Sequence, residues 1–207
     1  MESKVVVIIS REGKIPVHYL NLIDQKVKVV LEAKPFLDLA RNFALYHVKD
    51  YDRILMIDDD VIPKLPVSQI FNNELIEKYD VVCGIYWLKS HMATSVAVPS
   101  IFGERTWLPQ PPSMPVEVNA CGTGFLLING RFVRETFAKA KEVGGWFDVK
   151  IEDWEEEKYE GEDVYFFDTF KPRAVADPRL VAWHKAYGEY YFNEYGVIEA
   201  IGGVKTD

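Results

Sequence analysis

The chain of 207 residues is poor in cysteine, in positive charge and in long apolar runs, and each shortage excludes a class of protein. Cys83 and Cys121 are its two cysteines, and their apolar surroundings predict buried thiols rather than a disulfide or a zinc site. Lysine and arginine number 24 against 32 acids, a net charge of −8 that disfavours nucleic acid as a partner. No apolar segment approaches the length of a transmembrane span, and the amino terminus carries no leader with a cleavage site. We therefore expect a soluble, cytoplasmic protein.

What the chain does contain is enough apolar material for a substantial core. Hydrophobic residues make up 48% of the chain and aromatic residues 14%, which excludes a disordered protein. This length and composition predict one domain over 1–207. Within it we distinguish a regular half, about 1–90, from a more irregular half, about 91–207.

Apolar periodicity alternates between strand and helix along the first half. Strands are predicted at Lys4–Ile9, Lys26–Leu31, Arg53–Ile57 and Asp80–Trp87, and helices at 35–48 and Val67–Lys78. The second half adds a strand at Gly122–Ile128 and a helix at Gly130–Lys141. Such alternation is typical of an α/β fold with a mostly parallel central sheet and helices on both faces.

Three adjacent carboxylates, Asp58, Asp59 and Asp60, follow the predicted strand Arg53–Ile57. Adjacent acids repel one another unless a cation or a proton lies among them. Oxygen ligands of this kind suit Mg²⁺ or Mn²⁺, and ligands of open α/β sheets bind outside the carboxyl ends of the strands. The triplet therefore indicates a metal–phosphate site, although a solvated turn explains three aspartates equally well.

The irregular half carries three further candidate features. Gly122 and Gly124 open an apolar strand, where glycine marks a bulge or the close approach of a ligand. Trp146 and Phe147 follow two glycines and are either core anchors or an apolar platform for a sugar ring.

The last feature combines an acidic pair with a histidine. Glu162 and Asp163 stand at the start of an aromatic run with helical spacing, where acids complement the helix dipole. His184 ends an apolar strand, and it is either a structural residue or a metal ligand.

In their order along the chain, these motifs resemble the GT-A class of nucleotide-sugar glycosyltransferases. The matching pieces are Ala40–Asn42, Asp58–Asp60, Gly122–Gly124, Trp146–Phe147, Gly161–Asp163 and His184. The resemblance implies a Rossmann-like GT-A fold and a metal-dependent glycosyltransferase that uses a nucleoside-diphosphate sugar as donor. It further implies a glycan, a protein or a lipid-linked molecule as acceptor.

The resemblance also implies roles for residues at the donor side of the site. Asp60 would bind the divalent metal, Mn²⁺ or Mg²⁺, and His184 would complete its coordination. Asp58 would reach the ribose or the metal shell. Arg41 and Asn42 would face the nucleotide.

The resemblance also implies which residues lie beside the donor sugar and the acceptor. Gly122 and Gly124 would leave room for the donor sugar. Asp163, with Glu162 beside it, would contact the acceptor hydroxyl, and a carboxylate there can take its proton as the oxygen attacks. Inverting transfer requires such a base, and we favour inversion over retention.

Two other functions fit part of the pattern. A HAD-type phosphatase would use Asp58 and Asp60 at its reacting centre and Asp163 with Asp168 for Mg²⁺, but its aspartate pair normally ends the first strand of the domain. A non-catalytic domain that binds a nucleotide or glycan is the third interpretation. The aromatic segment Tyr190–Phe192 would suit a homodimer contact.

Overall fold

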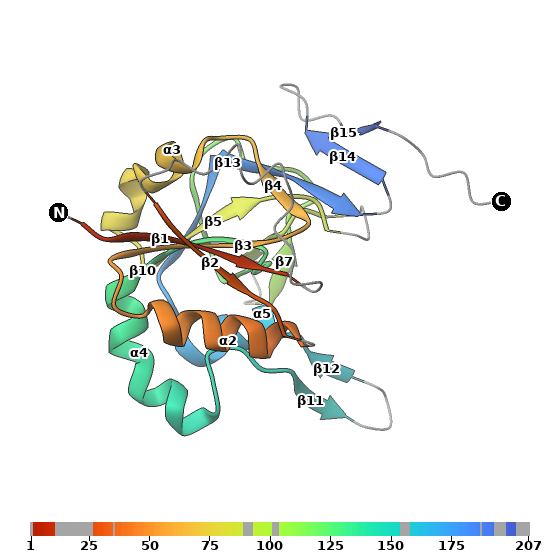
Figure 1. Ribbon diagram of the computed structural model, residues 1–207. Helices are drawn as coiled ribbons and strands as arrows, with labels where there is room; N and C mark the ends of the chain where they lie inside the picture. The colour runs from red at the N-terminus through yellow and green to blue at the C-terminus, as the bar shows by residue number, and fades with distance from the viewer. Residues whose placement is uncertain are drawn as a thin grey trace.

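The computed structural model describes residues 2–10, 27–34, 36–88, 93–100, 104–153, 158–186, 188–192 and 198–201. One large sheet runs through the middle of the molecule (Figure 1). Its strands, in spatial order, are β2 (Lys28–Glu32), β1 (Lys4–Ile9), β3 (Arg53–Asp58), β10 (Phe125–Asn129), β5 (Val81–Ile85), β13 (Ala174–Ala186), β14 (Gly188–Phe192) and β15 (Ile198–Ile201). Strands β4 (Val61–Pro63) and β8 (Val116–Val118) also pair with β13.

The directions of the central strands confirm the predicted α/β class. Strands β2, β1 and β3 run parallel to one another, as do β5 and β13, while β10 runs antiparallel to both β3 and β5. Five of these six strands therefore share one direction. Strands β1, β3 and β5 are almost entirely buried, as expected for β-branched runs covered on both faces.

Helices cover the two faces of the sheet. Helices α2 (Leu37–Val48), α4 (Gly130–Val143) and α5 (Glu162–Phe170) contribute to one apolar cluster, and α3 (Val67–Phe71) with the 3₁₀ helix η1 (Glu74–Glu77) contributes to the other. The predicted helix Val67–Lys78 is thus two short ones. Asn73 explains the break, because its side chain accepts a hydrogen bond from the Leu75 N–H at 3.0 Å and starts a new helix.

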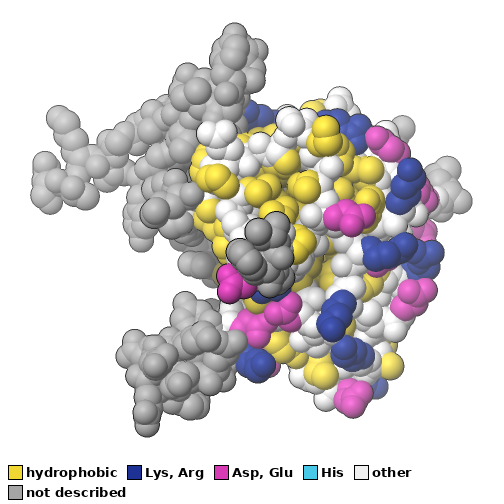
Figure 2. All heavy atoms as spheres, turned by 180° about the vertical axis from the view of Figure 1, so that it is seen from behind, with side chains coloured by type: hydrophobic (Ala, Val, Ile, Leu, Met, Phe, Trp, Pro, Cys, Tyr) yellow, Lys and Arg dark blue, Asp and Glu magenta, His cyan; other side chains and the backbone are white. Residues whose placement is uncertain are grey.

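Smaller sheets complete the fold. Strands β6 (Val96–Pro99), β7 (Arg105–Trp107) and β9 (Ala120–Cys121) form a three-stranded sheet, and β11 (Lys150–Asp153) pairs with β12 (Lys158–Glu160). In the described part of the chain, no helix has the length and apolarity needed to cross a membrane. On the face seen in Figure 2, the coloured Lys and Arg side chains are interspersed with Asp and Glu around an apolar centre, so that face presents no continuous basic surface.

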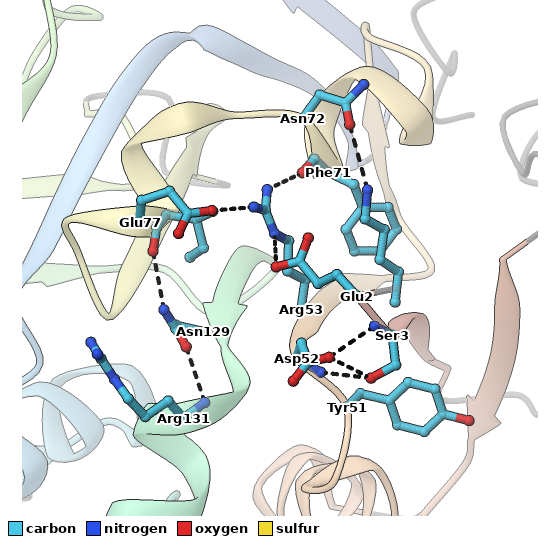
Figure 3. A network of polar contacts seen from close by, with 12 residues as sticks. Glu2, Ser3, Tyr51, Asp52, Arg53, Phe71, Asn72, Glu77, Asn129 and Arg131 are labelled. Atoms are coloured by element: carbon cyan, nitrogen blue, oxygen red, sulfur yellow. Dashed lines mark hydrogen bonds and ion pairs between the residues drawn. The ribbon is translucent and has the colours of Figure 1, made fainter.

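The amino-terminal ends of β1 and β3 are tied together by a polar network (Figure 3). Arg53 donates to the Glu2 carboxylate at 2.6 Å, and it also contacts Glu77 and the Phe71 carbonyl. Asp52 accepts from the N–H and the hydroxyl of Ser3, each at 2.9 Å. These contacts fix the sheet at the end opposite the aspartate triplet.

The prediction of two buried thiols is wrong, because Cys83 and Cys121 form a disulfide. Their Cα atoms lie 6.5 Å apart, within the span that a disulfide bridges. Both residues are fully buried, as expected, but β5 and β9 bring them together from positions 38 residues apart. The bond joins the central sheet to the strand that leads directly into Gly122.

We expect the disulfide to contribute about 4 kcal/mol to the free energy of unfolding, since it closes a loop of this length in the unfolded chain. Urea unfolding of the double variant Cys83→Ala, Cys121→Ala measures this loss. Thiol titration of the denatured, unreduced protein provides the control and should detect no free thiol. Two titrating thiols would contradict the pairing.

Candidate functional site

A cleft of about 220 Å³ opens at the carboxyl end of β3. It brings together eight residues for which the resemblance implies a role at the site: Arg41, Asp58, Asp60, Gly122, Gly124, Glu162, Asp163 and His184. They come from α2, from the last residue of β3 and the turn after it, from the segment before β10, from the start of α5 and from β13. The Asp58 N–H donates to the Gly124 carbonyl at 3.0 Å, which joins the end of β3 to the entry of β10.

Arg41 lies at the base of this cleft and is only 2% exposed. Its Nη2 donates to both Asp58 oxygens, at 2.8 and 3.0 Å, and its Nη1 donates to Glu162 at 2.8 Å. Burial alone would lower the pKa of Arg41, but the charges of Asp58 and Glu162 outweigh it and raise the pKa. Arg41 is therefore a permanent cation that links α2, β3 and α5.

The three aspartates of the triplet have different environments. Asp58 is held by Arg41, yet burial and the nearby charge of Asp60 raise its pKa. Asp59 accepts from the Ser10 hydroxyl at 2.7 Å, which links the turn to the end of β1. Asp60 faces His184, with 3.5 Å between its Oδ2 and the histidine Nε2.

His184 is oriented by the backbone on its far side. Its Nδ1 lies 2.6 Å from the Trp87 carbonyl oxygen, and because a carbonyl can only accept, Nδ1 carries the proton. In the neutral ring, Nε2 then presents its lone pair toward Asp60. Metal-binding histidines are commonly held in this way.

Glu162 and Asp163 occupy the first turn of α5, as the sequence predicts. One oxygen of Asp163 accepts from the Val164 N–H at 2.8 Å, an interaction that lowers its pKa. Burial and the charge of Glu162 nevertheless prevail, and the pKa of Asp163 is raised. A raised pKa suits a carboxylate that must take up a proton.

Sequence reasoning missed Tyr86, which lies at the centre of the site. Its hydroxyl accepts from the Gly124 N–H at 3.0 Å, and its ring meets the His184 ring edge-on, with 5.2 Å between centroids. Burial and the charge of Asp58 raise the pKa of this phenol, so it stays protonated. A Cβ at Gly124 would lie 2.8 Å from the Tyr86 oxygen and 3.1 Å from Asp58 Oδ2, so the hydroxyl is the nearest of the atoms that favour glycine at this position.

Asn42, Trp146 and Phe147 are corrected by the structure, because none of them lines the cleft. Trp146 and Phe147 are 3% and 1% exposed, and both belong to the core cluster under α2 and α4. Asn42 accepts from the Trp146 and Phe147 N–H groups at 2.7 and 3.0 Å and donates to the Phe147 carbonyl at 2.7 Å. An aromatic pair that packs in the core offers no platform to an acceptor.

The charges that line the cleft do not balance. Arg41 opposes the carboxylates of Asp58, Asp59, Asp60, Glu162 and Asp163. Among the residues that the structure describes, no three His, Cys, Asp or Glu side chains form a complete cation site. The excess negative charge nonetheless favours a cationic ligand, since like charges at close range destabilise each other's ionised forms.

We expect Gly124→Ala to lower the free energy of unfolding by about 1–3 kcal/mol, because the added methyl overpacks the Tyr86 hydroxyl. Adding Tyr86→Phe removes that contact, so the double variant should lose at least about 1 kcal/mol less than the sum of the single changes. Urea unfolding of the four proteins measures the coupling. Tyr79→Phe, whose hydroxyl donates to Glu117, is the matched control and should combine additively with Gly124→Ala. Additive behaviour of Tyr86→Phe would contradict the assignment.

We expect Asp163→Asn to stabilise the protein at neutral pH. The pKa of Asp163 is higher in the folded than in the unfolded protein, so between these two values the folded state binds more protons and stability falls as pH rises. The gain from Asp163→Asn should therefore be absent below about pH 4, grow above it and level off beyond the folded pKa. Urea unfolding across pH measures it, with the exposed Asp148→Asn as control. A variant less stable than the native protein at pH 7 would contradict the raised pKa.

No family model matches this chain, and no curated protein matches it. A similar solved structure is A197 from STIV, with 25% identity, a TM-score of 0.69 and coverage of 100% of this chain and 98% of that one. The glycosyltransferase GlyE of Streptococcus pneumoniae TIGR4 has 16% identity and a TM-score of 0.46 over 85% of this chain and 45% of its own. A UDP-glucose pyrophosphorylase has 9% identity and a TM-score of 0.45 over 91% of this chain and 76% of its own. The last two similarities are too low to carry an inference, whereas A197 is similar in fold over the whole chain.

Proposed function

We propose that this protein is a metal-dependent glycosyltransferase that moves a sugar from a nucleoside-diphosphate sugar to an acceptor hydroxyl. One observation carries the proposal: a single cleft holds the buried Arg41–Asp58 pair, with Asp60 and His184 on one side and Asp163 on another. These groups fit sugar transfer, namely a place for a cation that would bind the donor diphosphate and a base for the acceptor, around a buried ion pair that holds them in position.

The residues present fit a divalent cation in part. Asp60 offers a carboxylate, and His184 offers Nε2 with its proton fixed on the opposite nitrogen. Both groups are suitable ligands for Mn²⁺, and phosphate oxygens of the donor would complete the shell. Asp58 gives both oxygens to Arg41, so we place it behind these ligands as a residue that orients the site. When bound, the metal would supply positive charge to the departing diphosphate.

Asp163 is the proposed base. Its raised pKa increases its basicity, and its hydrogen bond to the Val164 N–H fixes one oxygen in place. In the proposed inverting reaction, Asp163 takes the proton of the acceptor hydroxyl as that oxygen attacks the sugar. Glu162 is engaged by Arg41, so we assign it the task of holding α5 against α2.

The phosphatase alternative loses support from the position of Asp168. That carboxylate pairs with Arg105 and does not line the cleft, so it is not placed to share a metal with Asp58 and Asp60. The second metal acid of a HAD-type site would therefore be absent from this cleft. A domain that binds a nucleotide without turnover would have the same binding site and lack only the transfer activity. An activity measurement therefore separates this alternative from the proposed enzyme.

The experiment is a thermal-shift panel of nucleoside diphosphates, each with and without Mn²⁺. We expect one diphosphate to raise the melting temperature only when Mn²⁺ is present, because a ligand that binds the folded state stabilises it by mass action. Asp60→Ala should abolish the shift, while Asp168→Asn, outside the cleft, should retain it. Absence of any shift across the panel would contradict the donor site.

The second arm uses Asp163→Asn and the diphosphate that the panel identifies. We expect this variant to keep the thermal shift and to lose nearly all sugar transfer, with hydrolysis of the matching nucleotide sugar as the readout where no acceptor is known. Loss of the shift would contradict the base assignment. Full transfer activity in Asp163→Asn would contradict the inverting mechanism.

A further inference from the structure

Thr123 lies between the two glycines of the segment that leads into β10, and it lines the cleft. The residue is only 3% exposed. Its hydroxyl forms no hydrogen bond with any residue in the described part of the chain. The hydroxyl is nevertheless not enclosed by protein atoms, as the Nε of Arg41 is, so it is open to the cleft.

Other hydroxyls that are shielded from water in this protein have partners. Thr94 is fully buried, and its hydroxyl donates to the Leu108 carbonyl at 2.9 Å. Ser95 is also fully buried, and its hydroxyl donates to the Gly84 carbonyl at 3.2 Å. A shielded hydroxyl without a hydrogen bond is unfavourable, and valine, which has nearly the same shape, would avoid that cost. The hydroxyl of Thr123 therefore points to a ligand.

The backbone on both sides of Thr123 is held in place. Before it, the Gly122 N–H donates to the Ser95 carbonyl at 2.7 Å. After it, the Gly124 N–H donates to the Tyr86 hydroxyl at 3.0 Å. The threonine is thus presented from a constrained segment, so little conformational freedom is lost when it binds a ligand.

The two glycines leave Thr123 as the side chain that this segment offers to the cleft. A Cβ at Gly122 would lie 2.4 Å from the Tyr86 oxygen, and one at Gly124 would lie 2.8 Å from it. The glycines therefore allow the Tyr86 hydroxyl to approach the backbone closely. Recognition of a ligand by a side chain of this segment then depends on the threonine.

Tyr86 locates the segment between the two ends of the proposed reaction. Its ring meets the His184 ring, with 5.2 Å between centroids, on the side of the proposed metal. In addition to burial and Asp58, the charge of Asp163 raises the pKa of Tyr86, so the proposed base lies near it as well. In sugar transfer, the sugar lies between the departing diphosphate and the acceptor hydroxyl. Thr123 adjoins the glycine that binds the Tyr86 hydroxyl, and so it lies beside the space for the sugar.

The chemistry of the cleft favours a sugar hydroxyl as the partner of this threonine. A hydroxyl both donates and accepts hydrogen bonds, whereas an ionised carboxylate only accepts them. The carboxylates of the cleft repel a phosphate unless a metal lies between them. A neutral sugar hydroxyl pairs with a threonine without any counter-ion.

We propose that the Thr123 hydroxyl binds a hydroxyl group of the donor sugar and thereby selects among nucleotide sugars. This inference rests on the proposed function, because it assigns a contact within the same cleft. A site built to hydrogen-bond a hydroxyl discriminates strongly against an analogue that lacks it. Because the Thr123 hydroxyl has no partner in the described protein, removing it takes away a contact with the ligand and leaves the fold intact.

Calorimetric titration in the presence of Mn²⁺ tests the inference. The probes are the nucleoside diphosphate that the thermal-shift panel identifies and the sugar derivative of it that binds most tightly. Thr123→Val should bind the diphosphate like the native protein and the nucleotide sugar about tenfold more weakly, because one neutral hydrogen bond is lost. Thr123→Ser keeps a hydroxyl and should retain the binding. Thr106→Val, at an exposed position of β7, is the matched control and should bind both probes like the native protein.

A set of donor analogues, each lacking one sugar hydroxyl, identifies the group that Thr123 binds. The native protein should bind one analogue about tenfold more weakly than the parent nucleotide sugar. Thr123→Val should bind that analogue and the parent equally, because the pair of hydroxyls is already broken. Urea unfolding provides the structural readout. Thr123→Val should be as stable as the native protein, which a threonine that supports the fold would not be.

The outcomes separate this inference from the proposed function. Equal binding of the nucleotide sugar by the native protein and Thr123→Val would overturn the inference and leave the donor site in place. Weaker binding of the diphosphate itself by Thr123→Val would also overturn it, and would assign the threonine to the phosphates. If no nucleoside diphosphate binds the native protein, the proposed function fails and this inference fails with it.

Discussion

The buried ion pair between Arg41 and Asp58 is the interaction on which the rest of the site depends. A guanidinium that is 2% exposed must be paired, and Asp58 and Glu162 provide its partners from different elements. Removing one partner of such a pair leaves an uncompensated buried charge, which costs about 3–5 kcal/mol. The relative positions of α2, β3 and α5 are therefore fixed by electrostatics at the same point where the cleft forms.

That arrangement leaves the cleft with more negative charge than Arg41 can compensate. The pKa values of Asp58 and Asp163 are raised as a result, since burial and neighbouring carboxylates both oppose ionisation. A protein selected for stability alone would replace Asp163 with a neutral residue. Functional sites are the usual place for perturbed carboxylates, because a ligand that supplies positive charge relieves the repulsion only when it binds.

The sheet could be predicted from the sequence because local patterns determine its strands. Apolar runs such as Lys4–Ile9 and Arg53–Ile57 are typical of strands in a sheet that is buried on both faces. The disulfide and Tyr86 could not be predicted in this way. Cys83 and Cys121 meet only because the tertiary structure brings β9 to β5, and Tyr86 looks like any aromatic residue after a buried strand until the fold sets its hydroxyl against Gly124.

The aromatic pair expected at the acceptor has an indirect connection to the site. Trp146 and Phe147 fill the core under α2, and their backbone groups hold the side chain of Asn42 with three hydrogen bonds. Asn42 is the residue after Arg41, so those bonds fix the rotation and position of α2 where the guanidinium enters the cleft. A sequence motif can mark residues that matter to a site, but it does not show whether they contact the ligand or support the residues that do. Here the burial of Trp146 and Phe147 shows that they support the site.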